Sequence, residues 1–173
     1  MGASSVRAFF RTLGLAGAVV ALDQLSKLWL VASLPYGTQK TVVPGFFDLV
    51  HTRNRGVAFG LFSQAGPWSQ AVLLVLVVAL VGFVAWQLFL QRHRWAARVG
   101  LSLIFGGALG NLADRLLRGE VVDFLDFYLS WGGRSYHWPA FNVADASITL
   151  GALWLLAFEL FFAKVGGHAS NPR

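Results

Sequence analysis

Residues 71–90 read AVLLVLVVALVGFVAWQLFL, a run of twenty residues without a charged side chain. A helix rises about 1.5 Å per residue, so this run would extend about 30 Å, which is the thickness of the hydrocarbon core of a bilayer. A helix with one face in water carries polar residues along that face, and this run has almost none. The run therefore predicts a transmembrane helix.

Three further apolar segments are long enough to cross a bilayer, at 12–31, 99–117 and 143–163. Two charged residues interrupt the first of them, and no small-residue cleavage site follows, which distinguishes it from a cleavable signal peptide. We expect an α-helical membrane protein with four transmembrane helices, forming a single integral membrane domain over residues 1–173.

The composition excludes several other classes of protein. Hydrophobic residues make up 56% of the chain and charged residues 13%, at a mean hydropathy of +0.60, so a water-soluble fold and a disordered chain are both excluded. The absence of cysteine excludes disulfides and thiol catalysis, and the four histidines lack the spacing of a metal site. The net charge of +6 comes from basic residues that flank apolar runs, so we expect no nucleic-acid partner.

The distribution of lysine and arginine predicts the orientation. Residues 1–11, 91–98 and 164–173 hold seven of these residues in 29 positions, whereas 32–70 and 118–142 hold five in 64. Short cytoplasmic segments carry an excess of lysine and arginine. We therefore expect both termini in the cytoplasm and the two longer loops outside.

The first outer loop contains a stretch with the character of β-strands. From 41 to 62 it is rich in valine and phenylalanine, with Gly45, Gly56 and Gly60 as turn residues. We expect a small β-sheet on the outer surface.

Polar residues inside the predicted spans converge on the outer half of the membrane. Asp23 and Lys27 are four residues apart, and Asn111 lies three and four residues before Asp114 and Arg115, so each set shares one helix face. Ionisable residues within a membrane are costly and are functional candidates. Alternatively, Asp23–Lys27 and Asp114–Arg115 are ion pairs that hold the bundle together, and the spacing leaves both interpretations open.

Asp123 and Asp145 have no basic residue three or four positions away on their own segments. Two unpaired carboxyl groups close together share one proton, which supplies a general base and a general acid. Such a pair can activate water against an amide without a metal or a covalent intermediate. Asp126, three residues after Asp123, is an alternative that spacing does not dismiss, although we interpret it as a solvated loop acid.

Five sequence blocks lie in order along these segments: DQLSK at 23–27, NRGVAF at 54–59, GGALGNLADR at 106–115, VVDF at 121–124 and FNVAD at 141–145. The five blocks hold 30 residues and are distributed from residue 23 to residue 145. In this order, on four predicted spans, they resemble the bacterial lipoprotein signal peptidases, also called type II signal peptidases.

The resemblance implies an aspartic endopeptidase that cleaves diacylglyceryl-modified prolipoproteins just before the lipidated cysteine, at the outer leaflet of the bacterial inner membrane. It implies that Asp123 and Asp145 are the catalytic pair and that Asp126 is not catalytic. The residues that it places around the pocket or the substrate are Asp23, Lys27, Asn54, Asn111, Arg115 and Asn142.

The resemblance also implies a periplasmic β-cradle, a short periplasmic lid helix, and no metal or cofactor. The partners that it implies are lipid-modified prolipoprotein substrates, membrane lipids and inhibitors of the globomycin type. We expect the protein to be a monomer.

Overall fold

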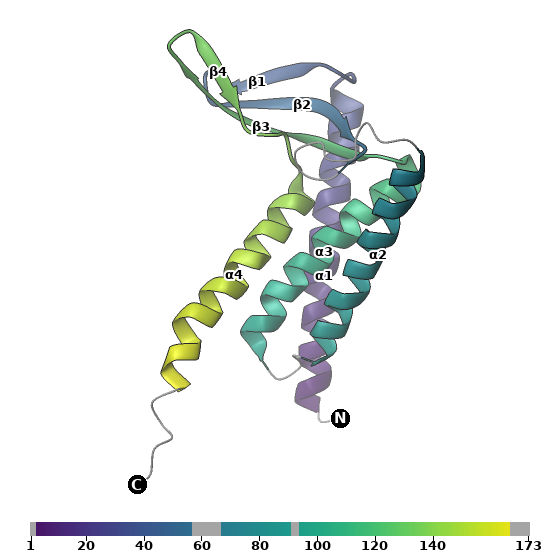
Figure 1. Cartoon of the computed structure of the whole chain (residues 1–173), viewed down its shortest axis with the longest axis vertical. Coiled ribbons are helices and arrows are strands. Elements are labelled where there is room, and N and C mark those ends of the chain that lie inside the picture. Colours follow the sequence, from purple (N-terminus) through teal and green to yellow (C-terminus); the bar gives the residue numbers. More distant parts are fainter. Residues whose placement is uncertain (1–2, 57–66, 91–93, 167–173) are drawn as a thin grey trace.

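The computed structural model describes residues 3–56, 67–90 and 94–166, most of which belong to four helices (Figure 1). The helices are α1 (Ala3–Ser33), α2 (Pro67–Leu90), α3 (Trp95–Arg118) and α4 (Val143–Gly166). Each is long and apolar enough to cross a membrane, and α2 is the most apolar, with a mean hydropathy of 2.7. The predicted four-helix membrane fold is confirmed.

Helix α3 lies at the centre of the bundle and packs against the other three helices. Gly106 and Gly110 lie four residues apart on α3 and face α1. A Cβ atom at Gly106 would lie 2.7 Å from the carbonyl oxygen of Ala16, and one at Gly110 would lie 2.6 Å from Oδ2 of Asp23. These glycines therefore allow α1 to approach α3 closely enough to bring its polar side chains to the bundle axis.

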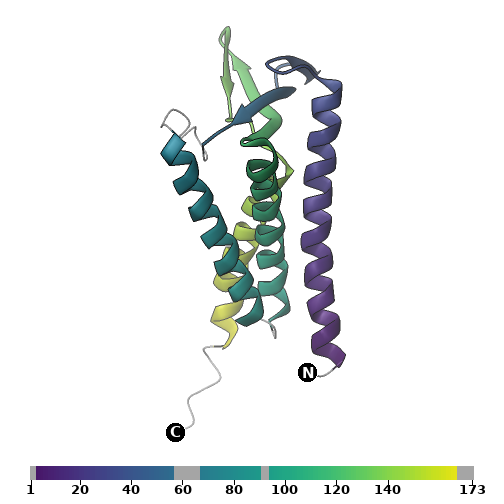
Figure 2. The same cartoon turned by 90° about the vertical axis from the view of Figure 1, so that its right-hand side faces the viewer.

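A four-stranded antiparallel sheet lies across one end of the bundle (Figures 1 and 2). In spatial order its strands are β1 (Gln39–Val43), β2 (Phe47–Asn54), β3 (Val121–Trp131) and β4 (Arg134–His137). The predicted sheet is confirmed, but the prediction that its strands come from 41–62 is incomplete. Two strands come from the predicted loop 118–142, because β3 is rich in the β-branched and aromatic residues that strands favour.

The described residues contain no helix apart from α1 to α4, so the lid helix that the resemblance implies is not among them. Residues 57–59 of the NRGVAF block lie outside the described residues.

Two chain reversals bring β3 and α4 to the same end of the bundle. Gly119 ends α3 in the left-handed region, with φ 75°, and its N–H donates to the carbonyl oxygen of Arg115 at 3.2 Å. The strand β3 begins two residues later, and after β4 the chain turns into α4. The start of α1 and the end of α4 both lie away from the sheet (Figure 2).

Candidate active site

Asp123 is the third residue of β3 and is held by amide groups from two other segments. Its side chain is buried, with 3% exposed. Nδ2 of Asn142 donates to Asp123 Oδ1 at 2.7 Å, and Nδ2 of Asn54 donates to Oδ2 at 3.2 Å. The antiparallel register places Asn54 opposite Val121, so the end of β2 lies beside the carboxyl group. Both donors are neutral, so they orient the carboxyl group without giving it a counter-charge.

Asp145 lies in the first turn of α4, where a capping box holds it. The N–H of Asp145 donates to Asn142 Oδ1 at 2.9 Å, and the N–H of Asn142 donates to Asp145 Oδ2 at 3.3 Å. The other carboxylate oxygen, Oδ1, accepts Nδ2 of Asn111 on α3 at 2.8 Å. The local sequence NVAD thus determines both where α4 begins and where this carboxyl group lies.

The side chain of Asn142, which is fully buried, joins the two aspartates. Its Oδ1 accepts the N–H of Asp145, while its Nδ2 donates to Asp123 and lies 3.2 Å from the carbonyl oxygen of Val122. One amide group is therefore bonded to the strand that carries one aspartate and to the helix that carries the other. This arrangement fixes the position of the two carboxyl groups relative to each other.

The surroundings of Asp123 favour its protonated form. Burial is the main cause, and the negative charge of Asp145 acts in the same direction. Together they outweigh the hydrogen bonds from Asn54 and Asn142 and raise the pKa of Asp123 to about 7. Near neutral pH this carboxyl group can therefore exchange a proton with a bound reactant.

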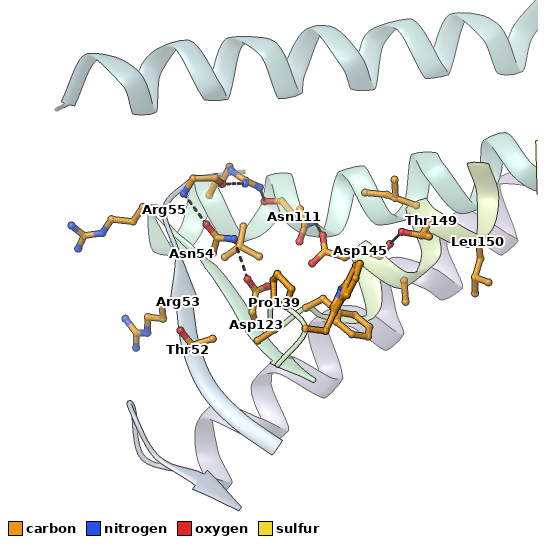
Figure 3. Close-up of a pocket in the computed structure, with 18 residues that line it drawn as sticks. Thr52, Arg53, Asn54, Arg55, Asn111, Asp123, Pro139, Asp145, Thr149 and Leu150 are labelled. Carbon is orange, nitrogen blue, oxygen red and sulfur yellow. Dashed lines mark hydrogen bonds between the residues drawn. The ribbon is translucent and has the colours of Figure 1, made fainter. Parts of the chain in front are cut away.

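A cavity of about 1180 Å³ opens beside the two aspartates, between the sheet, α3 and α4 (Figure 3). This volume exceeds the range of about 300–1,000 Å³ that is usual for small-molecule sites, so it suits a longer ligand. Its polar lining includes Thr52, Arg53, Asn54, Arg55, Asn111 and Arg115, and its apolar lining includes Phe141, Ile148 and Leu150. Among the described residues no group of three or more His, Asp or Glu side chains could hold a metal ion.

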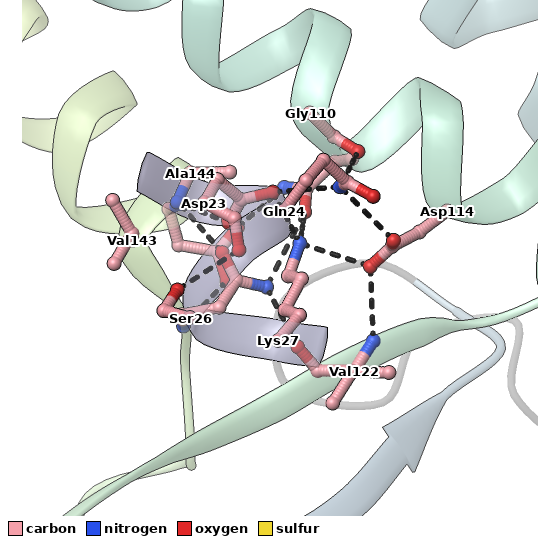
Figure 4. Close-up of polar contacts among 12 residues, drawn as sticks. Asp23, Gln24, Ser26, Lys27, Gly110, Asp114, Val122, Val143 and Ala144 are labelled. Atoms are coloured by element: carbon pink, nitrogen blue, oxygen red, sulfur yellow. Dashed lines mark hydrogen bonds and ion pairs between the residues drawn. The ribbon is translucent and has the colours of Figure 1, made fainter. Parts of the chain in front are cut away.

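Behind the two aspartates a buried ionic network joins α1 to α3, β3 and α4 (Figure 4). Lys27 Nζ lies 2.7 Å from Asp23 Oδ2 and 2.9 Å from Asp114 Oδ2, and all three side chains are fully buried. Asp23 Oδ1 accepts the N–H of Ala144 at 2.9 Å, and Asp114 Oδ2 accepts the N–H of Val122 at 3.2 Å. Ala144 and Val122 each directly precede one of the two aspartates, so the network positions the backbone on both sides of the site.

Asn111 connects this network to the aspartates. Lys27 Nζ donates to Asn111 Oδ1 at 3.2 Å, and Nδ2 of Asn142 lies 3.3 Å from the same oxygen. Because donors occupy the oxygen side of the amide, its NH₂ group points to Asp145. Lys27 and Asp23 do not line the cavity, and their contact with the site runs through Asn111 and the backbone.

The two ion pairs that were given as an alternative interpretation have different outcomes. The pair Asp23–Lys27 is confirmed. The pair Asp114–Arg115 is wrong, because Asp114 pairs with Lys27 and Arg118 instead. Adjacent residues on a helix point about 100° apart, whereas Arg118 lies four residues on and shares the face of Asp114.

Arg115 joins α3 to the end of β2 and lines the cavity. Its Nη2 donates to the carbonyl oxygen of Gly56 at 2.8 Å, and its Nη1 donates to that of Asn111 at 3.2 Å. The N–H of Gly56 in turn donates to Asn54 Oδ1 at 2.9 Å. Arg115 therefore holds the turn that directs the NH₂ group of Asn54 to Asp123.

Asp126 is not a solvated loop acid, and that interpretation is wrong. It lies on β3 with 7% of its surface exposed, and its Oδ2 is 2.8 Å from Nδ1 of His137 on β4. Residues three apart in a strand point to opposite faces, which separates Asp126 from Asp123. Asp126 is not among the described residues that line the cavity.

Gln24 and Arg118 complete the network, and the sequence reasoning missed both. Gln24 Nε2 donates to Asp23 at 3.0 Å and to Asp114 at 3.1 Å, while its Oε1 accepts Arg118 at 3.1 Å. A glutamine inside an apolar span was the available signal, because polar groups within a membrane need partners.

The fold and the site define a multi-pass membrane protein with two buried, jointly held aspartates beside a cavity at the sheet end of its helix bundle. A model of the Signal peptidase (SPase) II family matches residues 15–162. The chain belongs to this family, and it is accordingly a membrane peptidase.

Similar proteins agree with this assignment. The chain is 46% identical over 150 residues to the lipoprotein signal peptidase of Ralstonia nicotianae, which covers 86% of this chain and 83% of that one. It is 40% identical over 157 residues to that of Xanthomonas oryzae pv. oryzae, with coverages of 90% and 92%. A solved bacterial membrane enzyme superposes with a TM-score of 0.73 at 28% identity, covering 94% of each chain. The resemblance seen in the five sequence blocks is confirmed.

Proposed function

We propose that this protein removes the signal peptide from diacylglyceryl-modified prolipoproteins by cleaving before the lipidated cysteine, with Asp123 and Asp145 as its catalytic pair. The observation that carries the proposal is the joint fixation of these two carboxyl groups by Asn142 beside a large cavity. Two carboxyl groups that hold one proton supply the base and the acid that amide hydrolysis needs. The relatives named above are lipoprotein signal peptidases, which supports the substrate class.

In the proposed mechanism the ionised aspartate takes a proton from a water molecule between the two carboxyl groups. The water oxygen attacks the carbonyl carbon of the residue before the cysteine, while the protonated aspartate donates a hydrogen bond to the carbonyl oxygen. A proton then passes to the cysteine nitrogen as the C–N bond breaks. The signal peptide leaves with a new carboxyl group and the lipoprotein with a new amino terminus, so one water molecule is consumed.

The surrounding polar residues hold this pair in place. Three amides bond directly to the carboxyl groups or to the cap, an arginine holds the turn after β2, and an ion pair lies behind them. The residues with these positioning roles are Asn54, Asn111, Asn142, Arg115, Asp23 and Lys27.

We infer that the protein lies in the bacterial inner membrane with both termini in the cytoplasm and the sheet in the periplasm. The density of lysine and arginine supports this orientation, as does the position of the start of α1 and the end of α4 on the side away from the sheet (Figure 2). The cavity then lies at the outer leaflet, where a diacylglyceryl group is anchored. We also infer a monomer whose exposed apolar helix faces contact lipid, and whose cavity accepts inhibitors of the globomycin type.

The test is cleavage of a lipidated precursor by purified variants, with precursor binding measured on the same preparations. Asparagine has nearly the shape of aspartate but cannot cycle a proton, so Asp123→Asn and Asp145→Asn should each lower turnover by a factor of about 10³ or more. The double variant should be scarcely worse than either single one, because groups that act together are not additive. Asp126→Asn, on the same strand as Asp123, is the matched control and should keep most activity.

Two results would contradict the assignment of the pair. One is robust turnover by Asp145→Asn. The other is an inactive Asp126→Asn variant that folds and binds precursor normally.

A further inference from the structure

Two arginines at the end of β2 share one carboxylate. Arg53 Nη1 lies 2.7 Å from Glu120 Oε1, and Arg55 Nε lies 3.1 Å from Glu120 Oε2. The Glu120 side chain is only 13% exposed and uses one oxygen for each arginine. Among the described residues, Glu120 is the only acidic partner of either arginine.

This cluster carries an excess of positive charge. Burial acts against ionisation of Glu120, but the hydrogen bonds from Arg53 and Arg55 outweigh it and hold the pKa of Glu120 below its usual value. Glu120 is therefore ionised at neutral pH, and one negative charge faces two positive ones.

The arginines are positioned to bind a further anion. Arg55 contacts Glu120 through Nε, no bond of its two terminal nitrogens is found among the described residues, and its side chain is 69% exposed. The guanidinium of Arg53 lies over the ring of Tyr36, with Cζ 5.1 Å from the ring centroid, and this stacking restricts its orientation. Both arginines line the cavity that holds the two aspartates, and in Figure 3 they point away from those aspartates.

The cavity lining has a fixed order. Arg53 and Arg55, at the end of β2 and just after it, lie at one end. Asp123 and Asp145 lie in the middle, and Thr149 and Leu150 of α4 lie at the other end (Figure 3). On the proposed function, the lipid and the signal peptide of the precursor stay with the apolar helices. The segment after the cleaved bond must then leave on the side of the arginines.

We propose that Arg53 and Arg55 select precursors that carry aspartate or glutamate in the first few residues after the lipidated cysteine. This inference rests on the proposed function and adds a substrate preference to it. Guanidinium groups recognise carboxylates through paired hydrogen bonds. Because the arginines are partly exposed, the preference should be about twofold to fivefold in kcat/KM, which is the usual strength of a solvent-accessible charge pair.

The test uses three lipidated precursors that differ only at the second and third residues after the cysteine, which are both Asp, both Asn or both Lys. The purified full-length protein should cleave them with kcat/KM falling in that order, and high salt should narrow the differences. Arg55→Gln should bring the ratio of kcat/KM between the Asp and Asn precursors close to one. Arg55→Lys keeps the charge but loses the paired hydrogen bonds, so it should keep only part of that ratio. Arg134→Gln removes an exposed arginine of β4 that does not line the cavity, and this control should keep the wild-type ratio.

The outcomes separate this inference from the proposed function. If the wild-type protein cleaves none of the precursors, the proposed function fails. The inference alone fails if the wild-type protein cleaves all three precursors with equal kcat/KM. It also fails if Arg55→Gln lowers kcat/KM for all three precursors by the same factor. It also fails if the effect of Arg55→Gln follows the content of anionic lipid in bicelles instead of the charge of the precursor.

Discussion

Replacing Lys27 with methionine removes the cation that lies between two buried carboxylates. Methionine is similar in length, so the change removes charge and leaves most of the packing. Removing one partner of a buried pair costs about 3–5 kcal/mol, because a buried charge is left uncompensated. Here Asp114 keeps Arg118, and both Asp23 and Asp114 keep the amide of Gln24. We therefore expect a loss of about 3 kcal/mol, at the lower end of that range.

The assay is reversible unfolding in mixed micelles, which gives the free energy of unfolding of each variant. Lys40→Met is the control, because it replaces an exposed lysine of β1 with methionine. It should have little effect on the free energy of unfolding. The double variant Lys27→Met with Asp23→Asn removes a buried charge of each sign, so it should recover at least about 1 kcal/mol relative to the sum of the single changes. Wild-type stability of Lys27→Met, or strictly additive effects in the double variant, would refute the reasoning.

Four further predictions follow from the packing, the proton balance and the charge distribution. Gly107→Ala would press a Cβ atom against the carbonyl oxygen of Ala144 and displace the start of α4, so both stability and cleavage should fall. Gly82→Ala is the control in the same assays, because its Cβ atom would meet nothing within 4 Å. Cleavage should decline as the pH rises through about 7, where Asp123 loses its proton, and a flat profile from about pH 5 to 9 would contradict this. The folded-state pKa of Asp123 lies above the unfolded value of about 3.9, so this group lowers the free energy of unfolding as the pH rises from about 4 to about 7. Asp123→Asn should remove this contribution to the dependence of the free energy of unfolding on pH. Reporter fusions should place 118–142 in the periplasm, and a cytoplasmic signal there would reverse the proposed orientation.

The spans could be predicted because an apolar run of about 20 residues has few alternatives in a membrane protein. The ends of the helices were less predictable. Helix α1 extends from Ala3 to Ser33, well beyond the predicted span 12–31 at its start. Residues outside the hydrocarbon region follow helix propensity and local contacts, which the apolar run does not report.

The ion pairs of the site could be predicted only where both partners lie on one helix. Asp23 and Lys27 satisfy that condition, and their pair is observed. The second partner of Lys27 is Asp114, which comes from α3 and depends on the close approach of two helices. Nothing in the spacing along one helix contains that information.

The interpretation of Asp126 is wrong for a different reason, which is the periodicity of side-chain directions along its segment. In a loop over 118–142, a residue three positions from Asp123 would have no defined direction. In a strand the period is two, so the same spacing places Asp126 on the opposite face. The run VVDFLDFYLSW at 121–131 has the composition of a strand, and that signal would have separated the two carboxyl groups.

The charge balance of the buried network bears directly on the proposed chemistry. Asp23 and Asp114 carry two negative charges, and Lys27 and Arg118 carry two positive ones, so these paired groups have no net charge. An unpaired lysine at this position would lower the pKa of Asp123 and keep it ionised. Lys27, which lies between its own carboxylate partners, still lowers the pKa of Asp123, but this effect is smaller than those of burial and of the neighbouring aspartate. The network therefore fixes the backbone before both aspartates without removing the proton that the proposed mechanism requires.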